Sequence, residues 1–254
     1  MTGTFTPMPG AAPLHRQVSA QARMEARLML RNGEQLLLAV VIPVIVLIGG
    51  VTGSEHLGLS LEHDPVDVFA PGVLALAIMS TAFTSLAIST GFERRYGVIK
   101  RLGASPLPRS GLLMGKVGAL LMVEALQIVV ISAVAFALGW NPDPDALGFL
   151  LAVVTGTAAF AALGLFLAGA LRAEATLAAA NLVYLLLLAG GAVVLPISAY
   201  GAFGDLVRWL PSGALGSAMR SALIDGVTAW RDLLVLCGWA AIGTALTART
   251  FKWE

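Results

Sequence analysis

Six apolar runs, most of them long enough to cross a lipid bilayer as a helix, constrain the fold of this chain more than any other feature. A helix needs roughly 20 such residues to cross a hydrocarbon core of about 30 Å. A closed β-barrel, the other structure that spans membranes, would show short segments of alternating apolar and polar residues. We therefore predict an all-α polytopic membrane protein with six transmembrane helices. They are expected at Leu36–Thr52, Phe69–Phe92, Val117–Trp140, Ala146–Leu171, Ala175–Pro196 and Asp232–Ala248.

The composition supports lipid as the solvent for most of the chain. Hydrophobic residues make up 57% of the sequence and charged residues only 12%, with a mean hydropathy of +0.85, whereas soluble domains are roughly a quarter charged. A net charge of +1 argues against a nucleic acid partner, which requires a basic surface that neutralises many phosphates. The single Cys237 excludes an intramolecular disulfide, and the three histidines lack metal-ligand spacing, so no metal site is predicted.

Positive charge predicts the orientation, because Lys and Arg concentrate in short cytoplasmic loops. The loops after the first and third runs carry acidic residues and no Lys or Arg, whereas the long fifth-to-sixth connection balances both signs. We predict a bacterial inner membrane protein with both termini in the cytoplasm and no cleavable signal peptide. The residues on the predicted cytoplasmic side are Arg16, Arg23, Arg27, Arg31, Arg94, Arg95, Lys100, Arg101, Arg109, Lys116, Arg172, Arg249 and Lys252.

Residues 1–35 form a polar segment before the six-helix domain, which we place at residues 36–254. Arg16, Arg23, Arg27 and Arg31 are spaced by seven, four and four residues, so a helix would carry them on one face. This pattern is typical of a helix that lies along the membrane surface and meets anionic lipid head groups. The alternative is a basic flank that only sets the topology.

The connection between the second and third runs, residues 93–116, has internal order. Glu93 to Leu102 can continue as a helix, Gly103 is suited to end it, and two prolines then make a stiff turn before Ser110 offers a new N-cap. Topology alone would need only a few Lys or Arg residues. A short helix followed by a rigid elbow favours a contact surface for another protein.

Two stretches resemble the ABC-2 type permeases, the membrane subunits of many ATP-binding-cassette exporters. The first is Gly97-Val-Ile-Lys-Arg-Leu-Gly-Ala-Ser-Pro-Leu-Pro-Arg109 followed by Leu113-Met-Gly-Lys116, which is similar to the family's cytoplasmic motif except at Val98 and Gly103. The second comprises Gly190–Pro196, Trp209–Pro211 and Ala218–Gly226, which resembles the family's external re-entrant segment before the sixth helix, here residues 197–230. This chain lacks a further proline that the family usually has between Pro196 and Trp209.

The resemblance implies a permease that works with a separate ATPase subunit and a second permease chain, with ATP and Mg bound by the ATPase and no cofactor on this chain. It implies export of a small lipophilic compound such as a drug, antibiotic or lipid. The helix between the second and third spans would dock on the ATPase, with the charged residues as polar contacts and the apolar ones as anchors. The implied coupling residues are Glu93, Arg94, Arg95, Val98, Ile99, Lys100, Arg101 and Leu102.

Enzyme motifs are absent from the sequence. A phosphate-binding loop of the form G-x-x-x-x-G-K-[ST] does not occur, and Gly115-Lys116 lacks its context. We therefore predict a transport subunit that does not hydrolyse ATP. A gradient-driven secondary transporter, or a membrane anchor or sensor for a soluble partner, are the alternatives from other classes.

Two polar pairs inside the apolar runs are candidates for the translocation route. Glu124 and Gln127 lie three residues apart, hence on one helix face, and a carboxylate at that depth costs about 2–3 kcal/mol unless it faces protein or a cavity. Asn181 and Tyr184 form a similar pair in the fifth run. For both pairs the alternative is interhelical hydrogen bonding without substrate contact.

Overall fold

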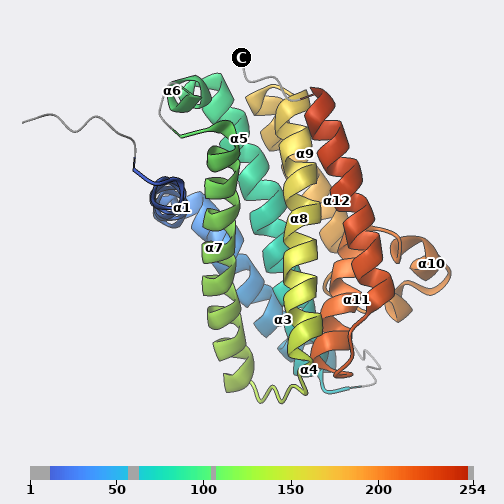
Figure 1. Ribbon diagram of the computed structural model, residues 1–254. Coiled ribbons are helices and arrows are strands. Elements are labelled where there is room, and N and C mark those ends of the chain that lie inside the picture. The colour runs from blue at the N-terminus through green and yellow to red at the C-terminus, as the bar shows by residue number, and fades with distance from the viewer. Residues whose placement is uncertain (1–11, 57–62, 104–106, 251–254) are drawn as a thin grey trace, which may run out of the picture.

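The computed structural model describes residues 12–56, 63–103 and 107–250, and every regular element in these ranges is a helix (Figure 1). The all-α prediction is therefore confirmed for the described chain. The elements are α1 (Leu14–Arg31), α2 (Gly33–Leu36), the π-helix η1 (Leu37–Val41), α3 (Ile42–His56), α4 (Pro65–Met79), the π-helix η2 (Ser80–Ser85), α5 (Leu86–Arg95), α6 (Val98–Gly103), α7 (Arg109–Ala137), α8 (Ala146–Ala170), α9 (Ala173–Gly190), the 3₁₀-helix η3 (Ile197–Phe203), α10 (Gly204–Val207), α11 (Pro211–Leu223) and α12 (Trp230–Thr250).

Five of the predicted spans are confirmed as helices long and apolar enough to cross a membrane. They are Pro65–Arg95, in which α4, η2 and α5 are continuous, and Ser110–Ala137, Ala146–Ala170, Ala173–Gly190 and Trp230–Thr250. The first predicted span is a shorter apolar helix, Ala39–Ser54. This helix includes residues 39–41 of the π-helix η1, and the count of six spans stays a prediction.

The helix formed by α4, η2 and α5 is the centre of the bundle. Its side chains are buried throughout residues 68–87, and it packs against α3, α7, α8, α9 and α11. Gly164 of α8 lies directly against the backbone of η2, where a Cβ atom would be 2.8 Å from the carbonyl oxygen of Phe83. The small residues of α8 therefore serve close helix packing, as their pattern indicates.

The ends of the bundle differ in what they carry. Figure 1 shows α6, the α8–α9 turn and the C-terminal end of α12 at one end, which we call the basic end. The connections from α7 to α8 and from α11 to α12 lie at the opposite end. This arrangement agrees with the grouping of charges in the sequence.

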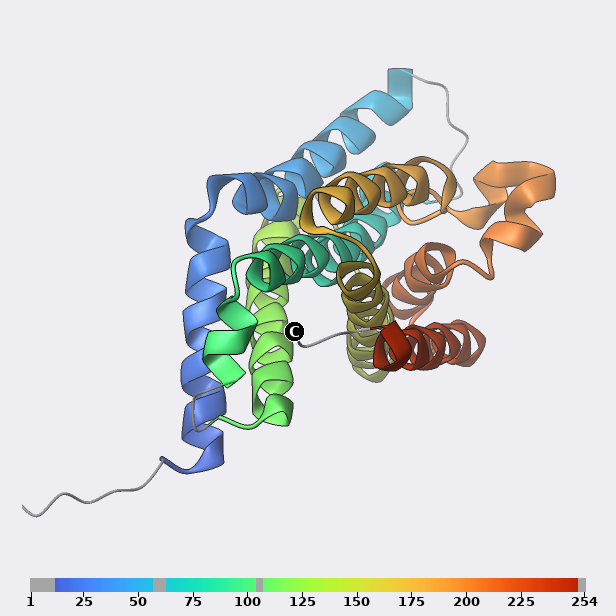
Figure 2. The same cartoon turned by 90° about the horizontal axis from the view of Figure 1, so that it is seen from above.

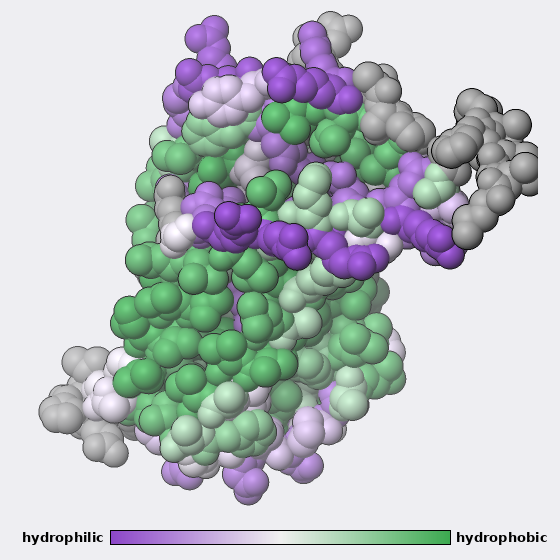
Figure 3. Space-filling view, turned by 90° about the vertical axis from the view of Figure 1, so that its left-hand side faces the viewer, coloured by the Kyte–Doolittle hydropathy of each residue, from purple (hydrophilic) through white to green (hydrophobic). Residues whose placement is uncertain are grey.

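Helix α1 lies across the side of the bundle and packs along the first half of α7 (Figures 1 and 2). Its buried residues are Gln21, Ala22 and Ala26, whereas Arg16, Arg23 and Arg27 are exposed. These charges form a hydrophilic band above a hydrophobic surface in Figure 3. The amphipathic helix predicted within residues 1–35 is thus present at Leu14–Arg31.

The segment between α9 and α12 folds back at the end opposite to α6. The short helices η3 and α10 expose Phe203 and Leu206, and the turn after α10 exposes Trp209. Helix α11 then packs inside the bundle against α4 and α8. Arg220 of α11 donates hydrogen bonds to the carbonyl oxygens of Ala192, Val193 and Val194, at 2.9, 3.2 and 3.2 Å. The buried guanidinium thereby fixes the non-helical chain after α9.

Candidate functional site

The chain turns sharply between α5 and α6, at the basic end. The sequence predicts one helix from Glu93 to Leu102, but α5 ends at Arg95, Gly97 has a φ of +67°, and α6 starts at Val98. Glycine adopts this left-handed conformation readily, so the helix breaks at the residue where a positive φ costs the least conformational free energy. The expectation of a continuous helix is therefore wrong, and α6 is a separate helix laid across the end of the bundle (Figure 1).

Helix α6 has one apolar side and one charged side. Ile99 is buried, and with Leu102 it lines a small space against Leu112 and Leu165 of the bundle. Lys100 and Arg101 are exposed. Ile99 and Leu102, expected as apolar anchors for a partner, thus also pack within the chain, and their role at a partner surface stays a prediction.

Arg94 and Arg95 hold the end of α5 to two other helices. The guanidinium of Arg94 donates to the carbonyl oxygens of Ala168 and Gly169, at the C-terminal end of α8. Arg95 forms an ion pair with Glu174 in the first turn of α9. Both arginines therefore have partners within the chain, and their expected contact with another subunit is not their only role.

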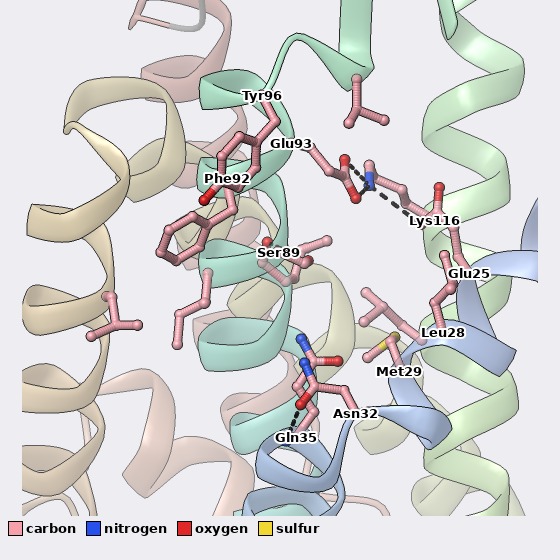
Figure 4. Close-up of a pocket in the computed structure, with 15 residues that line it drawn as sticks. Glu25, Leu28, Met29, Asn32, Gln35, Ser89, Phe92, Glu93, Tyr96 and Lys116 are labelled. Atoms are coloured by element: carbon pink, nitrogen blue, oxygen red, sulfur yellow. Dashed lines mark hydrogen bonds and ion pairs between the residues drawn. The ribbon is translucent and has the colours of Figure 1, made fainter.

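Glu93 belongs to a cluster of three charges that also joins α1 and α7 (Figure 4). The Lys116 ammonium lies 2.7 and 3.0 Å from the two carboxylate oxygens of Glu93 and 3.3 Å from Oε2 of Glu25. Gln21 donates to the other oxygen of Glu25, at 2.7 Å. Burial raises the pKa of the Glu25 carboxyl, and repulsion from Glu93 adds to this rise, while Lys116 and Gln21 oppose it.

A basic depression of about 390 Å³ lies between the end of α5 and the α8–α9 turn. Arg94, Arg95 and Arg172 line it together with Glu174. Arg172 is exposed there. The basic end thus presents a second charged surface next to α6, suited to contact with an acidic surface of another protein.

The predicted translocation residues lie deeper in the bundle and serve helix packing. Glu124 is buried, and its Oε2 accepts a hydrogen bond of 2.7 Å from Thr157 of α8. Gln127 accepts one of 3.0 Å from Thr81 of η2, and its amide nitrogen donates to the carbonyl oxygen of Ala39. Both residues therefore make interhelical hydrogen bonds.

Asn181 and Tyr184 lie in α9 as the spacing predicts. Tyr184 is buried, with its hydroxyl beside Ser80 of η2, whereas Asn181 is half-buried. Asn181, Tyr184 and Glu124 line neither the small space under α6 nor the basic depression. A role for these four residues in translocation stays a prediction.

The family is decided by a comparison of the whole chain with protein-family models. The model described as ABC-2 type transporter matches residues 16–224, which include the elements from α1 to α11. The chain belongs to the ABC-2 type transporter family. It is a membrane transport component and not a catalytic subunit. A comparison with curated proteins finds no match.

In this ABC-2 permease, three consecutive residues before α6 each contact a different part of the bundle. Glu93 reaches α1 and α7 through Lys116, Arg94 reaches α8, and Arg95 reaches α9. The end of α5 is therefore joined to α1, α7, α8 and α9 by charged contacts. Among the described residues, no group of three His, Cys, Asp or Glu side chains is placed to hold a metal ion.

Sequence reasoning missed the ion pairs that join Lys116 to Glu93 and Glu25. Lys116 was assigned to the basic cytoplasmic side and to the family motif, although it is buried between these two carboxylates. Glu25 is an acid between Arg23 and Arg27 on the basic helix, and this inversion of charge is the signal that could have identified it.

Proposed function

We propose that this permease is the membrane half of an ATP-driven exporter in the bacterial inner membrane. Two copies would combine with two ATPase chains, which bind ATP and Mg and dock at the basic end on the cytoplasmic side. The cargo would be a small lipophilic compound, since the described loops at the opposite end form no separate domain. Members of this family usually work with an ATPase partner.

The proposal rests on the two sides of α6. The charged side is exposed, and the apolar side is packed against the bundle. Lys100 and Arg101 are free to meet a partner surface, while Ile99 holds the helix against the bundle. The residues directly before α6 then connect it to α7, α8 and α9. Nucleotide binding drives transport only if it favours one conformation of the membrane helices over another. Through its contact with α6, the ATPase would shift the populations of these conformations.

Co-purification tests this proposal. The permease is expressed with its ATPase subunit and purified in mild detergent, as wild type and as a Lys100→Glu, Arg101→Glu double variant. We expect the wild type to retain the ATPase and the double variant to lose most of it. Arg249→Glu is the matched control, because Arg249 is exposed in the last turn of α12 at the same end. An ATPase that stays bound to the double variant, or one that never accompanies the wild type, contradicts the proposal.

A further inference from the structure

A cavity of about 450 Å³ lies in front of α5, between α1, α2, α7 and α9 (Figure 4). This volume falls within the range of small-molecule sites, roughly 300–1,000 Å³. The cavity is open on one side, and its wall combines charged, aromatic and aliphatic side chains. Lys100 and Arg101, the exposed contacts proposed for the ATPase, do not line it, whereas Glu93 and Val98 of the implied docking set do.

The charges that line the cavity are unequal in number. Among the described residues of its wall, the ionisable acids and bases are Glu25, Glu93 and Lys116, so two carboxylates share one ammonium. The three side chains are 13%, 23% and 11% exposed, respectively, and water screens them only in part. Arg94 donates to α8 and Arg95 pairs with Glu174 of α9, and neither arginine lines the cavity. The cavity therefore holds one negative charge in excess, which costs free energy unless a cation or a proton neutralises it.

The pKa of Glu25 supports this account. Burial and the neighbouring Glu93 raise it above its ordinary value even though Lys116 is close. The single ammonium is thus insufficient to stabilise both carboxylates fully, and a second cation would find favourable electrostatics at this position.

The rest of the wall suits the hydrocarbon part of a lipophilic cation. The rings of Phe92 and Tyr96 are stacked, with centroids 6.1 Å apart. Aromatic faces attract cations within about 6 Å, and the Arg95 guanidinium already lies 5.7 Å from the centroid of the Tyr96 ring. Leu28, Leu86 and Leu177 add hydrocarbon surface around them. Figure 4 shows the rings on one side of the cavity and the charge cluster on the other.

We propose that this cavity binds a lipophilic organic monocation, with its positive charge beside the carboxylates that share Lys116 and its hydrocarbon part against Phe92 and Tyr96. That such a cation is also the cargo rests on the proposed export function. Binding itself does not, because every residue of the cavity belongs to this chain. An ammonium group of a membrane lipid has the same chemistry as a free amphiphilic cation, and the experiment separates the two sources.

Equilibrium dialysis with radiolabelled tetraphenylphosphonium tests binding. The full chain is purified in dodecyl maltoside, which has no ammonium group, without any ATPase. Tetraphenylborate, an anion of the same shape, is the matched probe, and detergent alone is the blank. We expect saturable binding of the cation and none of the anion. Competition by added phosphatidylethanolamine would support the same site with a lipid ammonium as its source, and an absence of competition would support a free cation.

Variants give the sign of the charge effect. Glu25→Gln and Glu93→Gln should each weaken binding of the cation about tenfold, whereas Lys116→Gln should strengthen it, because it removes the competing ammonium. A merely structural disturbance would weaken binding in all three. Tyr96→Leu changes an exposed ring and provides a variant with little risk of misfolding; it should also weaken binding. Asp205→Asn, an exposed acid on α10, should have no effect.

The proposal is overturned if tetraphenylphosphonium binds wild type and the Glu25→Gln, Glu93→Gln double variant equally, or if the anion binds as well as the cation. Failure of the ATPase to co-purify, with cation binding intact, would contradict the exporter proposal alone. Loss of cation binding with an intact ATPase complex would contradict only the cavity proposal.

Discussion

Gln127 of α7 donates its side-chain amide hydrogen to the carbonyl oxygen of Ala39 in η1. This carbonyl would ordinarily accept from the amide four residues later, but that residue is Pro43, which has no N–H. The oxygen of the same Gln127 side chain accepts from Thr81 in η2. One side chain therefore satisfies polar groups in both π-helical segments, where regular hydrogen bonding is interrupted.

We predict that Gln127→Leu destabilises the bundle by about 1–2 kcal/mol, because it leaves the Ala39 carbonyl and the Thr81 hydroxyl without this partner. Thermal unfolding in detergent, followed by intrinsic fluorescence, measures the loss. Pro43→Ala restores a backbone N–H for the Ala39 carbonyl, so the same change should cost less in that background. Equal losses of stability in both backgrounds would show that Gln127 does not replace the hydrogen bond that Pro43 cannot donate.

Arg94 and Arg95 are adjacent residues of the same type, but their partners are buried to different degrees. The same substitution at each position can therefore be compared directly. Arg94→Ala removes charged hydrogen bonds to two partly buried carbonyls and should cost about 1.5–3 kcal/mol. Arg95→Ala removes an ion pair whose side chains are 49% and 62% exposed, and should cost about 0–1 kcal/mol. The two variants are compared by thermal unfolding in the same detergent. Similar losses would contradict the assignment of Arg94 as the tighter connection between α5 and α8.

Arg94 and the exposed charges of α6 predict different effects on coupling. If the exporter proposal holds, Arg94→Ala should leave the ATPase bound, because α6 and its exposed charges are unchanged. ATP turnover should then respond less to transport substrate than in wild type. The Lys100→Glu, Arg101→Glu variant should instead lose the ATPase itself, so the two steps are separable.

Glu25 predicts a pH dependence of stability. Its pKa is raised in the folded protein, so the folded state holds the proton more tightly than the unfolded chain. This contribution to stability is fully present below the ordinary pKa of about 4.5 and is lost as the pH rises through the raised value. Wild type should therefore lose stability across this window, and Glu25→Gln should lose less. Melting curves at a series of pH values from about 4 to about 8 measure the difference; identical profiles would contradict the role of Glu25.

The sequence was sufficient for features that depend on local pattern. Hydrophobic runs located the five long helices, and the spacing of Glu124 and Gln127 placed both side chains toward other helices. Helix α1 followed from the periodic arginines. In each case the relevant residues are within a few turns of one another, so periodicity carries the information.

Contacts between distant segments could not be read in this way. Lys116 and Glu25 are 91 positions apart, and no local pattern joins them. Arg94 and Arg95 were indistinguishable as charges, because only the packing of α8 and α9 decides their partners. The break at Gly97 did have a local signal, an isolated glycine within a helical pattern, but the charged residues on both sides favoured continuity.

Substitution of Gly97 tests the backbone conformation of the α5–α6 junction without changing its side-chain contacts. A Cβ atom there would have no neighbour within 4 Å, so substitution introduces no clash and acts only through the positive φ of +67°. Gly97→Ala should destabilise the junction by about 1–2 kcal/mol, whereas Gly97→Asn should cost less because asparagine tolerates this conformation. Gly33→Ala is the control, since Gly33 also has open space but no positive φ. Hydrogen exchange of the α6 amides should increase in the order wild type, Asn, Ala. An alanine variant with the protection of wild type would show that the left-handed residue does not hold α6 in place.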